Sequence, residues 1–96
     1  MATTVILEVP VQPGKTDELI STFNEILPDT RSFKGCQSVT VHRDTTNPDT
    51  LLLIEHWDSA EDHAAYSEWR KNSGTLGPLM ALAAGRPATR ILDDVG

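Results

Sequence analysis

The sequence predicts an α+β fold in which one antiparallel sheet of four strands carries helices on a single face. The first observation behind this prediction is the order of the expected elements: strand, helix, strand, strand, helix, strand. The second is that the strand-like segments Thr3–Val11 and Leu51–Trp57 contain consecutive apolar residues and therefore need cover on both faces. With right-handed crossovers, both observations favour a split βαβ sheet of ferredoxin-like type, with these two strands at its centre.

Length, charge and cysteine content restrict the class of protein. The 96 residues are expected to form a single domain, residues 1–96. A net charge of -6 makes nucleic acid and anionic lipid surfaces poor partners. The one cysteine, Cys36, cannot form an intrachain disulfide, and no apolar run approaches the roughly 18–20 residues that span a bilayer. Met1 leads directly into a strand-like segment, so we expect a cytoplasmic protein.

The first strand and helix follow from the pattern of the N-terminal third. Thr3–Val11 is rich in β-branched residues and is followed by Pro13-Gly14, a turn signal. Apolar residues then recur at helical spacing between Lys15 and about Phe33, at Leu19, Ile20, Phe23, Ile26 and Leu27. Pro28 removes an intrahelical hydrogen bond, so a break is expected near Leu27.

The next two strands are expected to form a hairpin. Cys36–Asp44 alternates apolar and polar residues, as a half-exposed strand does. Residues 45–49 are dense in turn-forming residues and separate this strand from Leu51–Trp57. The hairpin loop is therefore longer than two residues.

The C-terminal part begins with a helix-start signal. Ser59 is a suitable N-cap, with Asp62 at the third helical position, and the helix should extend to about Asn72. Leu76–Ala84 is expected to form a second, short helix, and Ala88–Asp93 the last strand.

A sheet with helices on one face leaves its other face open. Leu52, Ile54 and His56 share one face of their strand, opposite to Glu55 and Trp57, so only one of His56 and Trp57 can point at the helices. A second copy of the sheet is the economical cover, which predicts a homodimer formed by sheet-to-sheet packing with His56 near the interface. The alternative is a monomer with a mildly apolar open face.

Several short motifs lie at matching places along this pattern. They are Gly35-Cys36 opening a strand, Val41-x-Arg43-Asp44 before Asn47-Pro48, Ile54-Glu55-x-Trp57-x-Ser59-x-Glu61, and Tyr66-x-x-Trp69-Arg70 followed by Gly74. With these motifs the chain resembles the antibiotic biosynthesis monooxygenase family over nearly its whole length. The resemblance implies a dimeric α+β barrel.

The resemblance also implies a chemistry. Members of the family that oxidise polycyclic phenols do so without flavin, haem or metal, so the expected protein is a monooxygenase with no cofactor and no metal, acting on a small quinol-like or anthrone-like aromatic. His63 and Tyr66 are the candidate catalytic residues. Trp57, Trp69 and Arg70 are the candidate substrate-binding residues.

Each candidate also has a structural interpretation. His63 lies in the first turn of its helix, where the positive dipole end lowers the pKa of an imidazole and favours the neutral base, but it could equally be an exposed histidine. Tyr66 could form a structural hydrogen bond, and Trp57 could be plain core. Which of His56, His63 and Tyr66 acts as base stays open, as does the identity of the substrate.

Other residues are interpreted structurally. Glu55 is a candidate for a structural ion pair with Arg70, Arg86 or Arg90, and Cys36 is expected to be a buried, inert thiol. The three histidines, His42, His56 and His63, match no metal-ligand spacing.

Departures from the family pattern keep other functions open. Phenol-oxidising members have an Asn on the strand before the Trp, where this chain has only apolar residues at 51–54. A non-catalytic dimer that binds a small molecule, or a stress-related protein, is therefore the alternative. The haem-degrading members of the family need an Asn on the first strand. Leu7, Glu8 and Val9 offer no such Asn, so haem binding or degradation is less favoured.

Overall fold

A computed structural model describes residues 1–96, and it confirms the predicted order of elements. Apart from the break expected near Leu27, each observed boundary lies within two residues of the prediction. The elements are β1 (Thr3–Pro10), α1 (Thr16–Arg31), β2 (Cys36–Arg43), β3 (Thr50–Trp57), α2 (Ala60–Asn72), α3 (Leu76–Leu82) and β4 (Ala88–Asp93).

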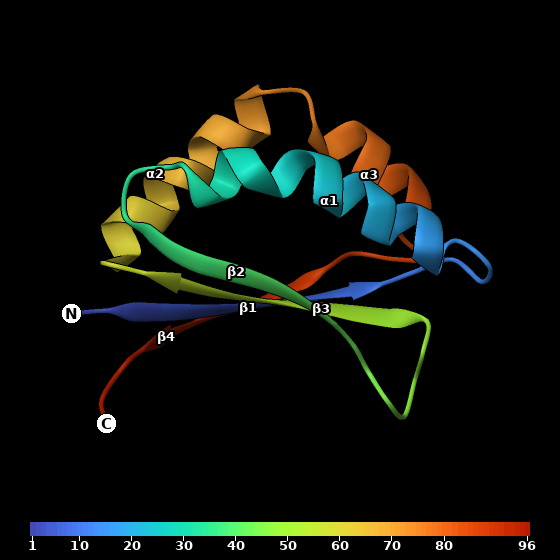
Figure 1. Ribbon diagram of the computed structural model, residues 1–96, viewed down its shortest axis with the longest axis horizontal. Helices are drawn as coiled ribbons and strands as arrows, with labels where there is room; N and C mark the ends of the chain where they lie inside the picture. Colours follow the sequence, from blue (N-terminus) through green and yellow to red (C-terminus); the bar gives the residue numbers. More distant parts are fainter.

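The sheet has the predicted ferredoxin-like topology. Its strand order is β2-β3-β1-β4 and all neighbouring strands are antiparallel, so the two strands with consecutive apolar residues are indeed central. All three helices lie on one face of the sheet (Figure 1). Along β3, residues Leu51, Leu53, Glu55 and Trp57 are buried while the residues between them are half-buried, as expected for a strand with helices on one side only.

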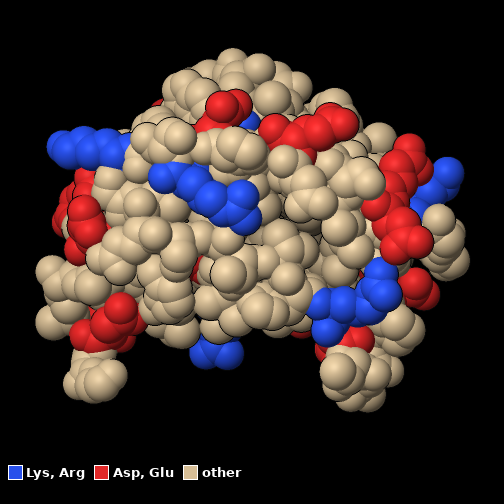
Figure 2. All heavy atoms as spheres, viewed as in Figure 1, with Lys and Arg blue, Asp and Glu red and all other residues tan.

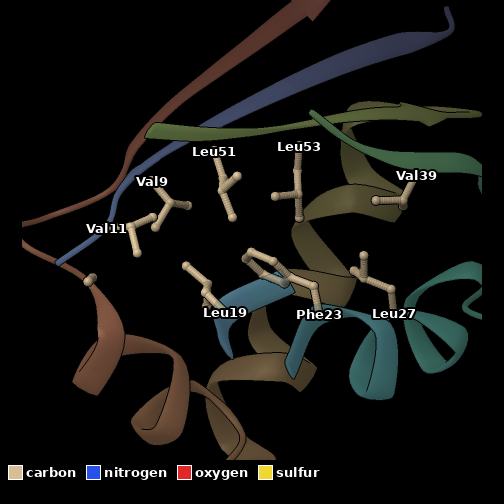
Figure 3. Packing of buried hydrophobic residues seen from close by; sticks show 9 residues of the cluster. Val9, Val11, Leu19, Phe23, Leu27, Val39, Leu51 and Leu53 are labelled. Carbon is tan, nitrogen blue, oxygen red and sulfur yellow. The ribbon is translucent and has the colours of Figure 1, made fainter. Parts of the chain in front are cut away.

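The hydrophobic core lies between α1 and the central strands. Three residues of α1 at four-residue spacing, Leu19, Phe23 and Leu27, point at the sheet (Figure 3). Opposite them, side chains from all three neighbouring strands complete the cluster, and these include Val9, Val39, Leu51 and Leu53. This core fixes the distance between the helices and the sheet.

The expected break near Leu27 is wrong, because α1 continues through Pro28 to Arg31. The last turn is held by contacts that the local sequence does not show. Arg31 donates two hydrogen bonds to the carbonyl oxygen of Val39, at 3.3 and 2.9 Å, and Thr30 is fully buried. These tertiary contacts compensate for the bond that the proline removes.

The opposite face of the sheet has no helix over it (Figure 1). Its central side chains are half-buried and largely apolar: Ile6, Leu52, Ile54 and His56. The Nδ1 atom of His56 lies 3.2 Å from the hydroxyl of Thr4.

Charged side chains of both signs are scattered over the face shown in Figure 2, without a continuous basic surface. None of the helices has the length and apolar character needed to cross a membrane.

The start of α2 is fixed by two local contacts. The hydroxyl of Ser59 accepts a hydrogen bond from the backbone N–H of Asp62 at 3.2 Å, which confirms the predicted N-cap. Gly35 has a φ of +87°, and a Cβ atom there would overlap the side chain of Asp62. Its carbonyl oxygen also accepts a bond from the N–H of Asp58 at 2.8 Å. Glycine at 35 therefore allows the loop before β2 to approach α2 closely.

Gly14 and Gly35 have the same backbone conformation but different surroundings. Gly14 has a φ of +80°, and no other atom lies within 4 Å of the position that a Cβ atom would take, so Gly14→Ala adds only the left-handed strain of about 1–2 kcal/mol. Gly35→Ala adds that strain and an overlap with Asp62, so its free energy of unfolding should fall by a further 1–3 kcal/mol, roughly. Urea unfolding of both variants measures the difference, and equal losses would contradict the close approach.

Candidate functional site

A cavity of about 290 Å³ lies between the sheet and the helices. Its volume is near the lower end of the roughly 300–1,000 Å³ typical of small-molecule sites. Most of its wall is apolar and comes from β1, β3, α1 and α3: Val5, Leu7, Phe23, Ile26, Leu27, Leu53, Leu76 and Leu79. The polar groups on its wall are Glu55, His63, Tyr66, Ser67, Arg70, Lys71 and Thr89.

Strand alternation and helical spacing place the polar groups together. Glu55 follows Leu53 on the helix side of β3, so it points into the layer between sheet and helices. On α2, His63, Ser67 and Arg70 are spaced four and three residues apart and share the face that lines the cavity. Two elements therefore supply these polar groups to the wall of an otherwise apolar space.

Glu55 is a buried acid at the wall of this cavity. The residue is 5% exposed, and one carboxyl oxygen accepts a hydrogen bond from the indole N–H of Trp57 at 3.0 Å. Burial raises the pKa of Glu55, and the Trp57 hydrogen bond opposes this rise because it stabilises the carboxylate. The result is a carboxyl group with a fixed orientation and an increased affinity for a proton.

His63 is the partner of Glu55. Its Nε2 atom lies 3.9 Å from the carboxyl oxygen of Glu55 and 3.4 Å from the hydroxyl of Ser67. The alternative of an exposed histidine is wrong, since His63 is 7% exposed. Its pKa is lowered as expected from the sequence, but the cause is burial. A neutral imidazole thus lies beside a buried carboxyl group, at a separation longer than a direct hydrogen bond.

Tyr66 and Arg70 form a second polar cluster on the cavity wall. The Nε of Arg70 donates to the hydroxyl of Tyr66 at 3.0 Å, and its Nη2 donates to the hydroxyl of Thr30 at 2.8 Å. The two hydroxyls are hydrogen-bonded to each other at 2.8 Å. Tyr66 therefore both lines the cavity and makes structural hydrogen bonds, the two interpretations that the sequence left open.

The two tryptophans lie outside the cavity wall. Trp57 is fully buried, and its indole N–H donates to Glu55. Its ring centroid lies 5.5 Å from that of His63. Trp69 is 41% exposed, and the guanidinium of Arg70 lies 4.8 Å from its ring centroid. Of the five candidate residues from the sequence, His63, Tyr66 and Arg70 line the cavity.

The position of Glu55 on the cavity wall was missed from the sequence, and its suggested pairing with an arginine is wrong. Glu55 makes no ion pair with Arg70, Arg86 or Arg90; its partners are Trp57 and His63. A signal was present, because an acidic residue shares the face of a central strand with core residues. Such a residue is costly to bury, and in a cleft it is a candidate for a functional site.

The remaining candidates lie elsewhere. His56 is on the open face of the sheet, across β3 from the cavity, and His42 is exposed on β2. Cys36 is half-buried, with the pKa of its thiol raised by burial and by the nearby Glu55. No group of three or more His, Cys, Asp or Glu side chains is arranged to hold a metal ion.

The sequence pattern of one family, described as antibiotic biosynthesis monooxygenase, matches residues 2–72. The chain belongs to this family. The match spans β1 to the end of α2 and so includes Glu55, His63, Tyr66 and Arg70. No curated protein gives a significant match to the sequence.

Solved structures named for the antibiotic biosynthesis monooxygenase family have the same fold. One from Chloroflexus aurantiacus is 27% identical, covers 100% of this chain and 95% of its own, and superposes with a TM-score of 0.80. One from Bordetella bronchiseptica is 23% identical over 98% of this chain and 97% of its own, with a TM-score of 0.78. One from Nitrosomonas europaea is 15% identical over 98% and 90%, with a TM-score of 0.88.

The raised pKa of Glu55 predicts how stability depends on pH. Because the folded state binds the Glu55 proton more tightly than the unfolded chain, this group stabilises the fold below the ordinary carboxyl pKa of about 4.3 and loses that contribution as pH rises through the raised value. Glu55→Gln keeps an oxygen for Trp57 but does not titrate. Its free energy of unfolding should therefore increase relative to wild type as pH rises from 4 to 8.

Urea unfolding at several pH values measures this difference. His63 is present in both proteins, so its own titration largely cancels. Glu61→Gln, an exposed substitution on α2 with the same change of charge, corrects for the general effect of net charge. A difference between wild type and Glu55→Gln that stays constant with pH would contradict the raised pKa.

Proposed function

We propose that this protein is a cofactor-independent monooxygenase that oxidises a small quinol-like or anthrone-like aromatic with dioxygen. The observation that carries the proposal is the buried pair of Glu55 and His63 at the wall of an apolar cavity. Membership of the antibiotic biosynthesis monooxygenase family supports it. The reaction needs a base, a donor to a developing oxyanion and exclusion of water, and the cavity wall contains side chains suited to each task.

The chemistry can be written for anthrone as a representative substrate. A base removes a proton from the methylene carbon, which leaves an electron-rich carbanion stabilised as the aromatic oxyanion. This anion reduces dioxygen, and a carbon–oxygen bond forms to give a peroxide. Loss of water then gives the quinone, so one oxygen atom enters the product and the other leaves as water. The substrate supplies both electrons, and no cofactor is required.

Glu55 and His63 would handle the proton. The raised pKa of Glu55 makes its carboxylate a stronger base than an ordinary one. His63 is kept neutral by burial and lies 3.9 Å from Glu55, so it would accept the proton from the acid through one bridging water. Trp57 holds the carboxyl group in place through its indole N–H. In this scheme Trp57 is a positioning residue.

Tyr66 would stabilise the developing negative charge. Its hydroxyl lies on the cavity wall and accepts a hydrogen bond from Arg70, which polarises the O–H bond. When Thr30 donates to Tyr66, the hydroxyl hydrogen of Tyr66 is free to donate to the substrate oxygen. The apolar side chains around the cavity keep water away from the carbanion.

Oxygen consumption by metal-free protein tests the proposal. With a panel of anthrones and hydroquinones, wild type should consume oxygen above the uncatalysed rate, and kcat/KM should rise with pH as Glu55 ionises. Glu55→Gln should lower kcat by about 10²–10⁴-fold, since it removes the base. His63→Asn should also lower kcat. The rise with pH should persist in a Cys36→Ser variant, because the Cys36 thiol, which also faces Glu55, titrates at higher pH.

His42→Asn is the matched control, because His42 is exposed on the edge strand β2 and is not part of the cavity wall. It should keep wild-type kinetics. Absence of turnover for the whole panel, or equal turnover by wild type and Glu55→Gln, counts against the proposal.

We also propose that two copies associate through the open faces of their sheets. Ile6, Leu52 and Ile54 are half-buried, apolar and adjacent on that face, and no helix of the chain covers them. Sheet-to-sheet packing of two copies would remove this apolar surface from water.

The association predicts a specific effect of charge on that face. Ile54→Lys should convert a dimer into a monomer in analytical ultracentrifugation, because each copy would place an unpaired ammonium group in the interface. Met80→Lys is the control: Met80 is 47% exposed on α3, on the helix side of the molecule, and its substitution should leave the dimer intact. A monomeric wild type at micromolar concentration would refute the dimer.

A non-catalytic binding protein remains the second candidate. It is favoured by the absence of an Asn on β3 before Trp57 and predicts a pocket filled by the protein's own side chains. The cavity is open and is lined by Tyr66, which favours the enzyme over a binding protein whose pocket is filled. Trp57 is not part of the cavity wall. The oxygen measurement separates the two candidates.

A further inference from the structure

Arg70 is a buried cation without a counter-ion. Its side chain is 4% exposed, and none of the ion pairs of the structure includes it. Its hydrogen-bond acceptors are all neutral: the hydroxyls of Thr30, Tyr66 and Thr75 and the backbone carbonyl of Ile26. Buried guanidinium groups normally face a carboxylate, so this arrangement is uncommon.

The hydrogen bonds of Arg70 also leave one donor unused. The Nε donates to Tyr66, Nη1 donates once, to Thr75, and Nη2 donates to Ile26 and Thr30. A guanidinium has five N–H groups, so one N–H of Nη1 has no acceptor. Neutral acceptors can satisfy the other donors but cannot neutralise the charge. Both the charge and a free donor therefore remain available to a ligand.

Arg70 lines the cavity, where this positive charge can be used. Lys71 adds a second cation to the cavity wall, and Glu55 is the only acidic residue on it. The wall is thus basic in a chain whose net charge is -6. An apolar cavity with a basic end suits a ligand that has an aromatic body and an anionic group.

We propose that the ligand of this cavity is an aromatic carboxylate, with its carboxylate on Arg70 and its ring between the apolar walls. This inference rests on the proposed function and adds the class of substrate. His63 and Arg70 are seven residues apart on α2, which corresponds to about 10 Å along the helix. A carboxylate at Arg70 therefore leaves room for a fused-ring aromatic whose far edge lies near Glu55 and His63, where the proton is removed.

Binding of a matched pair of ligands to wild type tests the inference. The two ligands, 2-naphthoate and 2-naphthamide, have nearly the same shape, but only the first is an anion at pH 7. A charge-assisted hydrogen bond to a buried guanidinium should make 2-naphthoate bind about tenfold to a hundredfold more tightly in isothermal titration calorimetry. Equal binding, or tighter binding of the amide, would overturn the inference.

Two variants with the same change of charge locate the effect. Arg70→Gln should abolish the preference for the carboxylate, whereas Lys15→Gln should retain it, because Lys15 is exposed and pairs with Glu18 outside the cavity. Circular dichroism establishes that Arg70→Gln is folded. If it is not, Arg70→Lys replaces it, and the preference should then be weakened, since an ammonium cannot keep the same hydrogen bonds. An unchanged preference in the folded variant overturns the inference.

The carboxylate site and the oxygenase activity can be refuted independently of each other. A preference for 2-naphthoate that depends on Arg70, in a protein that oxidises no anthrone, supports the carboxylate site and refutes the oxygenase. Turnover of neutral anthrones without any preference for 2-naphthoate supports the oxygenase and overturns the carboxylate site.

Discussion

The constraint on which this structure depends is the alternation of side chains along the central strand β3. Leu51 and Leu53 face the helices and form the core with α1, and Glu55, next on the same face, faces the cavity. Leu52 and Ile54 face the other way and give the sheet an apolar open surface. A register shift of one residue would exchange these faces, so the core, the acid and the open surface are specified together.

The cavity exists because α2 continues the layer that α1 begins. The Ser59 cap and the close approach of Gly35 to Asp62 fix where α2 starts, and its helical repeat then sets the positions of His63 and Arg70. Burying these polar groups costs stability, which a purely structural core would avoid. Arg70 illustrates this cost most clearly, since its charge is buried among neutral acceptors.

The sequence was sufficient for the fold and for part of the site. Consecutive apolar residues identified the central strands, and Ser59 identified the start of α2, because both signals are local. The continuation of α1 through Pro28 was not predictable, since it depends on contacts of Thr30 with a helix 36 residues further on. The site depends on burial, which the sequence does not show. From the sequence His63 could be in the cavity or in solvent, and only the packed structure shows that Glu55 lies beside Trp57 and His63.

In the proposed mechanism, protein side chains remove the proton and the resulting carbanion then reacts with dioxygen unaided. Proton exchange in the absence of oxygen isolates the first of these steps. In D₂O under argon, metal-free wild type should accelerate deuterium incorporation at the methylene carbon of anthrone, measured by NMR, and Glu55→Gln should not. Oxygen consumption without any acceleration of exchange, or equal exchange by wild type and Glu55→Gln, would contradict this mechanism.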